Sequence, residues 1–460
     1  MYIRQFYTPA LQQASYYLES NGEAAVIDPL RDAATYLQFA QERGASIRYI
    51  FETHYHSDFV SGHPELARAT GAPVVFGPGG LSGHIAQPGE RFLLGALTVE
   101  ALHTPGHTPE SLCLLLRDEN DNPCCLFSGD TLLTDDAGRP DPAQCDEQGA
   151  AALAAQLYGS MQQLLALPDR VIVYPAHGRP CESEAELRST VGSVRTSAPA
   201  LQQEGTEEFI RFVLKNNPPV PGYFQRNAAR NKTGSSILAG VLEQGLIPLD
   251  VSAFKAALAG EGSLVLDTRP QEQAADGMIP GSAWIGLEDR FARWAGLLLP
   301  PGSRLLLVCE PGREADVLLQ LARVGIEEAV GYLAGGYASW KEAGEPCDLY
   351  ITVEADELAM DLPHDDYLIV VDVRSEAEYA SGHVKDAVHL PLSEINDPAL
   401  LANIDERDNL YLHCSDGYRS AIACSLLKRQ GFHNLRLVDG GWGRIREEKI
   451  ETVQEKAALN

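Results

Sequence analysis

The sequence predicts a multidomain α/β protein in which a layered α/β domain precedes two copies of a smaller α/β domain. With 460 residues, the chain is too long to fold around one hydrophobic core, and its length suggests about two to four domains. Short β-rich runs alternate with helical patterns along the chain, as expected for stacked layers of strands and helices. Landmark residues then recur at a constant offset in the second half, which indicates an internal duplication.

The first domain is expected over residues 1–210. Runs such as "AAVIDP", "IRYIFETH", "APVVFG" and "VIVYPAHG" are typical of short strands, and helical stretches separate them. One clear helix follows Gln148, because Leu153, Leu157 and Met161 recur on a single apolar stripe. The polar residues that follow the strand-like runs are then expected at one edge of the sheets.

Composition limits the partners and the compartment. The net charge of −28 argues against nucleic acid and anionic membranes, because both are bound by basic surfaces. No run of about 18 apolar residues occurs, so we expect no transmembrane helix. The N-terminal residues lack the apolar core of a signal peptide, and the nine cysteines lack the spacing of a disulfide framework. We therefore expect a cytoplasmic protein. We also expect a homo-oligomer.

Residues 211–246 form a segment rich in Pro, Asn and Gly, which we interpret as a linker or an ordered arm. No acidic residue occurs between Phe209 and Leu242. The same stretch carries five cations, namely Arg211, Lys215, Arg226, Arg230 and Lys232. A solvated linker explains this bias, and so does an arm that binds an anionic ligand.

Two duplicated domains are expected at residues 247–347 and 350–456. The segment "LVLDTRPQEQAADGMIPGSAWI" matches "IVVDVRSEAEYASGHVKDAVHL", and each lies before a strand that ends in cysteine. Asp267 and Asp372 lie 105 positions apart (372 − 267). The same offset separates Gly277 from Gly382, Cys309 from Cys414, and Gly335 from Gly440. Each copy has the pattern strand, helix, strand and helix, within the normal size of a domain.

The cysteine of the second copy lies at a strand-to-helix turn. The strand "NLYLHC" leads Cys414 into "CSDGYRS", and a helix is expected to begin near Arg419. Backbone N–H groups and a helix N-terminus favour a thiolate there and can bind an anion. Gly417 allows the loop to curl, and Arg419 can neutralise an oxyanion such as sulfite or thiosulfate. A buried, inert cysteine is the alternative for Cys414.

This loop and the upstream "DVRSEAEYASGHV" resemble the rhodanese family of sulfurtransferases, which implies that Cys414 carries sulfur as a persulfide. In the first copy, the corresponding loop "CEPGRE" is one residue shorter. Glu310 and Glu314 oppose thiolate formation at Cys309, and Pro311 lacks a backbone N–H. We interpret the first copy as a degenerate, structural rhodanese-like domain.

Candidate metal ligands follow several strand-like runs of the first domain. They are His54, His56 and Asp58 in "ETHYHSDF", His107 in "HTPGHTPES", Asp130 in "LFSGDTLL" and His177 in "YPAHGRP". A lone histidine is more often structural, but such residues at several strand ends favour a metal site. The set resembles the metallo-β-lactamase superfamily over residues 1–210, which implies an αββα sandwich with these side chains at one edge.

Phe59 indicates that the site holds a single ion. In binuclear members of that superfamily, the acid of the first loop, the histidine after it and the last histidine bind the second ion. Here the residue after Asp58 is Phe59, so a second ion would keep too few ligands. The sequence therefore predicts a mononuclear centre.

The predicted metal ligands are His54, His107 and Asp130. Two imidazoles and one carboxylate are the ligand set of non-haem Fe(II) oxygen chemistry. A hydrolytic zinc site would instead keep about one open position, for water. We expect His56, Asp58 and His177 to orient the ligands or the bound substrate.

The segment "GDTLLTDDAGRPD" places Arg139 and Asp141 after Asp130, in an order similar to persulfide dioxygenases and glyoxalase II-like proteins. Nearly the whole chain resembles the bacterial multidomain persulfide dioxygenase–sulfurtransferases. That resemblance implies one Fe(II) per chain, O2 and a low-molecular-weight thiol persulfide, such as glutathione persulfide, that is oxidised to sulfite. Cys414 would form thiosulfate from sulfite, or it would load the dioxygenase with persulfide.

The resemblance also gives the arm a possible substrate. A glutathione-like carrier has two carboxylates, which this acidic chain must bind with cations placed nearby. Arg139 is one such cation. We expect Tyr223 to anchor the arm over the metal pocket, where Arg226 or Arg230 would pair with a substrate carboxylate.

Two other functions remain open. One is a zinc thioester hydrolase of the glyoxalase II type with accessory rhodanese-like domains, and both Phe59 and the Cys414 loop argue against it. The other is a non-catalytic role of the repeats in sulfide sensing or docking. That role suits the first copy, with its shortened loop, better than the second.

Overall fold

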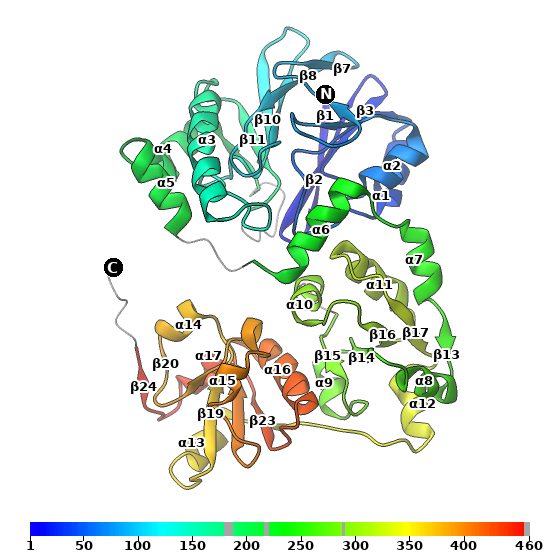
Figure 1. Cartoon of the computed structure of the whole chain (residues 1–460), viewed down its shortest axis with the longest axis vertical. Coiled ribbons are helices and arrows are strands. Elements are labelled where there is room, and N and C mark those ends of the chain that lie inside the picture. The colour runs from blue at the N-terminus through cyan, green and yellow to red at the C-terminus, as the bar shows by residue number, and fades with distance from the viewer. Residues whose placement is uncertain (179–186, 216–219, 288–289, 455–460) are drawn as a thin grey trace. The chain divides into compact units, whose positions relative to one another are not determined.

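The computed structural model describes residues 1–178, 187–215, 220–287 and 290–454 (Figure 1). The chain divides into two compact units, each described by itself below. Unit 1 comprises Met1–Val241 with Ala295–Leu297 and Leu319–Glu327, and unit 2 comprises Leu242–Trp294, Leu298–Leu318 and Glu328–Asn460. Residues 216–219 of the predicted arm and residues 455 and 456 of the predicted last domain lie outside the described residues.

Unit 1 contains two six-stranded sheets, of strand order β1-β2-β3-β4-β5-β6 and β12-β11-β10-β9-β8-β7. The first sheet consists of β1 (Tyr2–Thr8), β2 (Gln13–Ser20), β3 (Glu23–Ile27), β4 (Ser46–Phe51), β5 (Val74–Phe76) and β6 (His84–Ile85). The second consists of β7 (Arg91–Leu94), β8 (Leu97–His103), β9 (Leu112–Arg117), β10 (Pro123–Gly129), β11 (Ile172–Pro175) and β12 (Ser189–Thr190). Strands β3 to β6 pair in parallel, as do β10 and β11, and the other pairs are antiparallel.

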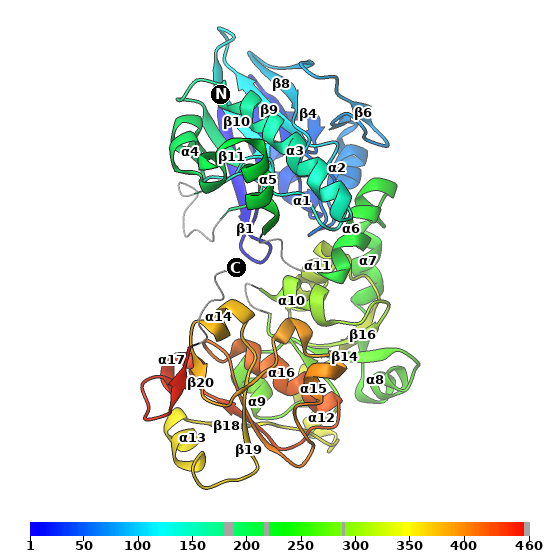
Figure 2. The same ribbon diagram turned by 60° about the vertical axis from the view of Figure 1, so that its left-hand side comes forward.

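The two sheets face each other across the main core, where Tyr16 and Phe51 of the first pack with Leu114 and Phe127 of the second. Helices cover both outer faces. They are α1 (Ala33–Glu42) and α2 (His63–Thr70) on the first sheet, and α3 (Glu147–Leu165), α4 (Val191–Ser197), the 3-10 helix η2 (Pro199–Gln202) and α5 (Gly205–Lys215) on the second. Figure 2 shows α3 in front of strands β9 to β11. The αββα sandwich implied by the resemblance is therefore confirmed.

Helix α3 forms where the apolar stripe predicted it. Asp146 caps its first turn by accepting a hydrogen bond from the Gly149 N–H (2.8 Å). Leu153, Leu157 and Met161 are buried against the second sheet, because their spacing places them on one face of the helix. Within the described ranges, no helix has the length and apolar character needed to span a membrane.

The arm is helical. Beyond α5 it forms α6 (Gly222–Thr233) and α7 (Leu238–Gly245), and Pro221 precedes α6 at a position where its missing N–H costs no helical bond. Tyr223 and Asn231 on α6 are buried, at 2% and 4% exposure. Because unit 1 extends without a break to Val241, most of the arm belongs to the same compact body as the sandwich.

Unit 2 contains two five-stranded parallel sheets of equivalent strand order, β13-β17-β16-β14-β15 and β18-β23-β22-β19-β21. The first repeat has β13 (Pro248–Leu249), β14 (Ser263–Asp267), β15 (Ala283–Trp284), β16 (Arg304–Val308) and β17 (Ala329–Leu333), with α8 (Val251–Leu258), α9 (Gln271–Ala275), α10 (Phe291–Leu298), α11 (Glu314–Arg323) and α12 (Gly336–Glu342). The second has β18 (Ile351–Val353), β19 (Leu368–Asp372), β20 (His383–Val384), β21 (Val388–His389), β22 (Asn409–His413), β23 (Leu435–Val438) and β24 (Thr452–Val453), with α13 (Ala355–Asp361), α14 (Glu376–Ala380), η3 (Leu392–Glu394), α15 (Pro398–Leu401), α16 (Tyr418–Arg429) and α17 (Gly441–Ile445).

The landmarks of the duplication form the same hydrogen-bond cluster in both repeats. In the first, Arg269 donates to the carboxylate of Asp267 (2.6 Å) and to the carbonyl of Gly277 (2.8 Å). The residues 105 positions later make the same two bonds, at 2.6 and 2.7 Å. A buried guanidinium needs such partners, so the repeated residues are explained by folding rather than chemistry. The predicted duplication is confirmed.

Candidate metal centre and cysteine loop

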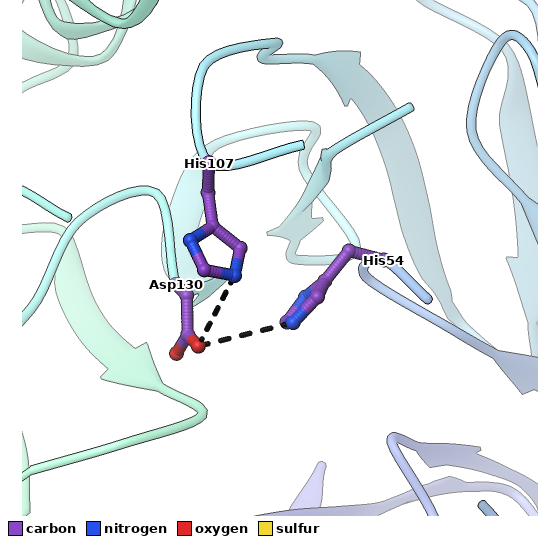
Figure 3. A group of neighbouring side chains, drawn as sticks. All are labelled: His54, His107 and Asp130. Carbon is purple, nitrogen blue, oxygen red and sulfur yellow. Dashed lines mark ion pairs between the residues drawn. The ribbon is translucent and has the colours of Figure 1, made fainter. Parts of the chain in front are cut away.

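Three side chains converge at one edge of the sandwich. His54 follows β4, His107 follows β8 and Asp130 follows β10. Their ligand atoms all lie within 4.8 Å of one another. Asp130 Oδ2 is 3.8 Å from His54 Nε2 and 3.6 Å from His107 Nε2, and Figure 3 shows both rings directed at the carboxylate. The structure thus brings together the three residues that the sequence predicts as ligands.

Each of the two histidines is held through its other ring nitrogen. His54 Nδ1 donates to Thr53 Oγ1 (3.0 Å), and that hydroxyl donates to Asp28 (2.8 Å). His107 Nδ1 donates to the carbonyl oxygen of Arg139 (2.6 Å). Both bonds place the proton on Nδ1 and leave Nε2 with its lone pair, which is the form of imidazole that binds a metal.

The protonation states of His54 and Asp130 suit a metal cation. Burial, together with the nearby His56 and His107, lowers the pKa of His54 well below its usual value. Burial alone would raise the pKa of Asp130, but His177, His107 and His54 outweigh it and lower that pKa. Neutral imidazole and ionised carboxylate are the states that coordination requires. The donor set therefore fits a divalent first-row ion such as iron or zinc.

His56 belongs to a second buried group, and its ring lies beside that of His54, with the two ring centroids 4.0 Å apart. Its Nε2 lies 3.2 Å from Asp28 Oδ1 and 3.6 Å from Glu52 Oε2, and all three side chains are buried. Burial lowers the pKa of His56, but the carboxylates of Asp28 and Glu52 outweigh burial and raise that pKa to about 9. His56 is therefore paired with two carboxylates, one of which, Asp28, also supports His54 through Thr53.

The ring of Phe59 packs against His56. The two ring centroids are 4.3 Å apart, and Phe59 is fully buried. Phe59 offers no ligand atom, and it also occupies the space beside the ring of His56. Position 59 thus carries an apolar side chain that packs against a histidine outside the trio.

His177 connects Asp58 to the trio. Its Nε2 lies 3.0 Å from Asp58 Oδ2, and its Nδ1 lies 2.7 Å from Asp130 Oδ1. Burial lowers the pKa of His177, but the carboxylates of Asp130 and Asp58 outweigh burial and raise it well above its usual value. Hydrogen bonds of this kind fix the orientation of a carboxylate that binds a metal.

Phe59→His is expected to create a second metal position, because the new imidazole would join Asp58 and His177 beside Asp130. The zinc content of the reconstituted variant should rise from about one ion per chain towards two, as measured by elemental mass spectrometry. Phe59→Leu is the matched control, since it also removes the aromatic contact with His56 but adds no ligand. Equal zinc contents in the two variants would contradict this role of position 59.

The Cys414 loop lies between β22 and α16. Cys414 is fully buried, and its Sγ accepts a hydrogen bond from the Gly417 N–H (3.1 Å) and lies 3.6 Å from Ser420 Oγ. Gly417 has a φ of 108°, a conformation that residues with a Cβ rarely adopt. The loop therefore curls so that a backbone N–H points at the sulfur, and Asp416 Oδ1 lies 3.5 Å from the same atom.

Arg419 is anchored beside this loop. Its two terminal nitrogens each lie 2.7 Å from an oxygen of Glu378, and one of them also lies 3.1 Å from Ser415 Oγ. The hydrogen bonds from Arg419 lower the pKa of Glu378 to about 2. A two-point pair of this kind fixes the plane of the guanidinium, so Arg419 has a defined position at the loop.

The corresponding loop of the first repeat, which carries Cys309, has a different environment. Burial, assisted by Glu314 and Asp267, raises the pKa of the Cys309 thiol to about 12. Arg313 pairs with Asp316 (2.7 Å) on helix α11. A protonated, buried thiol is a poor nucleophile, which supports the interpretation of this repeat as degenerate.

Comparison with known proteins agrees with this arrangement. Residues 250–343 and 354–448 match the rhodanese-like domain, and residues 8–85 match the metallo-β-lactamase superfamily. The mitochondrial persulfide dioxygenase ETHE1 of Bos taurus is 30% identical over 234 residues, which cover 48% of this chain and 83% of that protein. The chain belongs to the persulfide dioxygenase family of the metallo-β-lactamase superfamily. In this member of the family, two rhodanese-like domains follow the sandwich.

Other proteins resemble this persulfide dioxygenase family member. The probable hydroxyacylglutathione hydrolase glo2 of Schizosaccharomyces pombe is 31% identical over 211 residues, which cover 44% of this chain and 72% of that protein. A beta-lactamase hydrolase-like protein of Agrobacterium fabrum is 28% identical, over 46% of this chain and 55% of its own length. A metallo-beta-lactamase structure from Staphylococcus aureus has a TM-score of 0.64 at 28% identity, covering 73% of this chain and 99% of that chain.

The remaining residues predicted for substrate binding lie in varied settings. Arg139 lies next to the trio, because its carbonyl oxygen accepts the hydrogen bond from His107. Tyr223 is buried on α6, where its ring packs with that of Phe224. Arg226 is exposed on the same helix. Their proposed roles toward a substrate stay predictions.

Three side chains that position site residues in this persulfide dioxygenase family member were not predicted from its sequence. Asp28 supports both His54, through Thr53, and His56. Glu378 anchors the arginine of the cysteine loop, and Asn231 of the arm contacts the loop that carries His54. The capping pattern around Glu378 was a local signal that could have been used.

Proposed function

We propose that this chain is a non-haem Fe(II) persulfide dioxygenase that oxidises a low-molecular-weight thiol persulfide, such as glutathione persulfide, to sulfite. Its last domain would use Cys414 to form thiosulfate. The main support is the trio of His54, His107 and Asp130, whereas the Nε2 of His56 pairs with Asp28. Two imidazoles and one carboxylate leave several positions open, as oxygen chemistry requires, whereas hydrolytic zinc keeps about one.

The residues around the trio define the geometry of this centre. Fe(II) held there would supply the positions at which a persulfide sulfur and O2 meet. Thr53 fixes the ring of His54, the backbone of Arg139 fixes that of His107, and His177 orients Asp130. The overall oxidation consumes O2 and one water, and it releases the carrier thiol, sulfite and two protons.

The sulfur-transfer step belongs to the cysteine loop. A Cys414 thiolate would take the outer sulfur of a persulfide, and the carrier thiolate would leave. Sulfite would then attack that sulfur, forming thiosulfate and restoring the Cys414 thiolate. The Gly417 N–H would stabilise negative charge on the sulfur, and Arg419, which Glu378 and Ser415 hold beside the loop, would pair with the anion. A shared chain keeps the sulfite from the first step at high effective concentration for the second.

The test of this proposal is oxygen uptake by the full chain with glutathione persulfide, while sulfite and thiosulfate are quantified. We expect uptake that requires iron, with about one iron per chain after anaerobic purification. Two zinc ions per chain without oxygen uptake would overturn the proposal.

A zinc thioester hydrolase is the second candidate function. The similarity to glo2, a probable hydroxyacylglutathione hydrolase, favours it. The pairing of His56 with Asp28 and Glu52 argues against it, because a zinc site with about one open position needs more protein ligands than the trio supplies. Hydrolysis of a glutathione thioester by the zinc-loaded chain, independent of O2, would identify this activity.

We also propose that the arm binds the substrate carrier through Arg226, whose Nη1 bonds only weakly to the Gly222 carbonyl of its own helix (3.3 Å). An arginine–carboxylate hydrogen bond is worth about 1.5 to 3 kcal/mol, so Arg226→Ala should raise KM for glutathione persulfide about tenfold. The kcat should stay nearly constant, because the contact is equal in ground and transition states. Steady-state oxygen uptake at varied persulfide concentration measures both.

Arg230→Ala is the comparison. Arg230 donates to the Gly325 carbonyl and lies 3.4 Å from Glu327, so we expect a smaller rise in KM from its loss than from the loss of Arg226. Wild-type KM values in both variants would show that the arm does not bind the substrate carrier.

A further inference from the structure

The loop between β4 and α2, residues 52–62, is named the metal loop here because it carries His54. One amide side chain of the arm bonds to three of its backbone groups. Asn231 Nδ2 donates to the carbonyl oxygens of His56 and Phe59, both at 2.7 Å. Asn231 Oδ1 accepts from the Ser61 N–H at 2.9 Å. Both the nitrogen and the oxygen of this amide are thus used by the metal loop.

The end of helix α11 supplies a fourth bond to the same loop. The Val60 N–H donates to the carbonyl oxygen of Arg323 (2.7 Å). Arg31, whose side chain is fully buried, holds this helix end in place. It donates to the carbonyl of Ala322 (2.9 Å) and pairs with Glu327 (2.6 Å). All these residues lie in unit 1.

The four bonds satisfy backbone groups that water does not reach. The loop residues that make them, His56, Phe59, Val60 and Ser61, are at most 1% exposed. A buried N–H or carbonyl without a partner costs free energy, so the loop keeps this course only while its partners are present. Those partners come from α6 and from residues 319–327. The latter lie within the first rhodanese-like repeat by sequence, although they group with unit 1.

We propose that Asn231, together with the end of α11, positions the metal loop, so that the first rhodanese-like repeat serves the metal centre structurally. Asn231 bonds to the loop backbone on both sides of Asp58. One bond is at His56, two residues after His54, and the others are at Phe59 and Ser61. It bonds to the loop backbone and not to the ligands, so its effect on the ion is indirect. The role deepens the proposed function but concerns any ion that the trio binds.

The test is a titration of the full-length, metal-free chain with Co²⁺, followed by visible absorption. Asn231→Ala is expected to weaken Co²⁺ binding about tenfold or more, as is typical when a group that orients metal ligands is lost. The ligand-field bands should also shift, because His54 loses its fixed approach. Asn231→Ser, which keeps one hydroxyl for the loop, should give an intermediate affinity and serves if the alanine variant does not fold.

Asn227→Ala is the matched control. Asn227 lies one turn earlier on α6, is 1% exposed, and its amide makes no hydrogen bond within the described residues. The control should leave the affinity and the spectrum of Co²⁺ unchanged. Wild-type Co²⁺ affinity in both Asn231 variants would overturn the positioning role. Normal Co²⁺ binding by a wild-type chain that takes up no oxygen would count against the proposed dioxygenase and not against this inference.

Discussion

Replacing His54, His107 or Asp130 by alanine should abolish iron binding and oxygen uptake together. Each residue supplies one of three ligand atoms that lie within 4.8 Å of one another. Each substitution leaves the ion with only two protein ligands. Water then takes the vacated position, and a divalent ion is held weakly. Iron content after anaerobic reconstitution, measured by elemental mass spectrometry, and oxygen-electrode traces on the same samples check this expectation.

Asp58→Ala is the control for that set. Asp58 bonds to His177 (3.0 Å), which in turn bonds to Asp130, so its loss disturbs the ligand from two contacts away. Most of the iron should remain bound, with affinity reduced by about tenfold to a hundredfold at most. Iron loss as complete as in the alanine variants of the trio would show that the ligand assignment is wrong.

Cys414→Ser should stop thiosulfate formation while oxygen uptake with a small persulfide stays largely intact. Serine keeps the size of the side chain but cannot accept a sulfane sulfur, because its hydroxyl is a far weaker nucleophile than a thiolate. Sulfite should therefore accumulate in the variant. Parallel assays of oxygen, sulfite and thiosulfate on one reaction mixture separate the two steps.

Cys309→Ser provides the matched control in the first repeat. Cys309 is buried and its thiol pKa is raised to about 12, so the substitution removes no thiolate at neutral pH. We expect little change in either step. Loss of sulfur transfer in this variant, with transfer retained in Cys414→Ser, would reverse the assignment of active and degenerate repeats.

The fold could be predicted well from the sequence because its signals are local or periodic. The offset between Asp267 and Asp372 revealed the duplication, and the equivalent strand orders of the two sheets confirm it. The trio was also accessible, since strand ends at one sheet edge bring His54, His107 and Asp130 together. A cytoplasmic location and a homo-oligomeric state stay predictions.

The groups that support the site could not be predicted, because they act across long stretches of chain. Asn231 and Ser61 are 170 residues apart, and a neutral amide on a basic helix gives no pattern that points to a distant backbone. The absence of acids drew attention to the arm and to its cations. In the structure, however, Arg230 bonds to Gly325 and Glu327, and the hydrogen bonds to the metal loop come from the uncharged asparagine, while Lys232 lies over the ring of Tyr55 (5.7 Å to the centroid).

Helix α11 belongs to two bodies at once. It begins at Glu314 in unit 2, while residues 319–327 group with unit 1. The borders of the repeat, 250–343, therefore do not coincide with the borders of a compact body. In evolutionary terms, recombination could not replace this repeat by another rhodanese-like sequence without also replacing residues 319–327, which group with unit 1. An insertion or deletion near the end of α11 would disturb the bond between Val60 and Arg323 within unit 1.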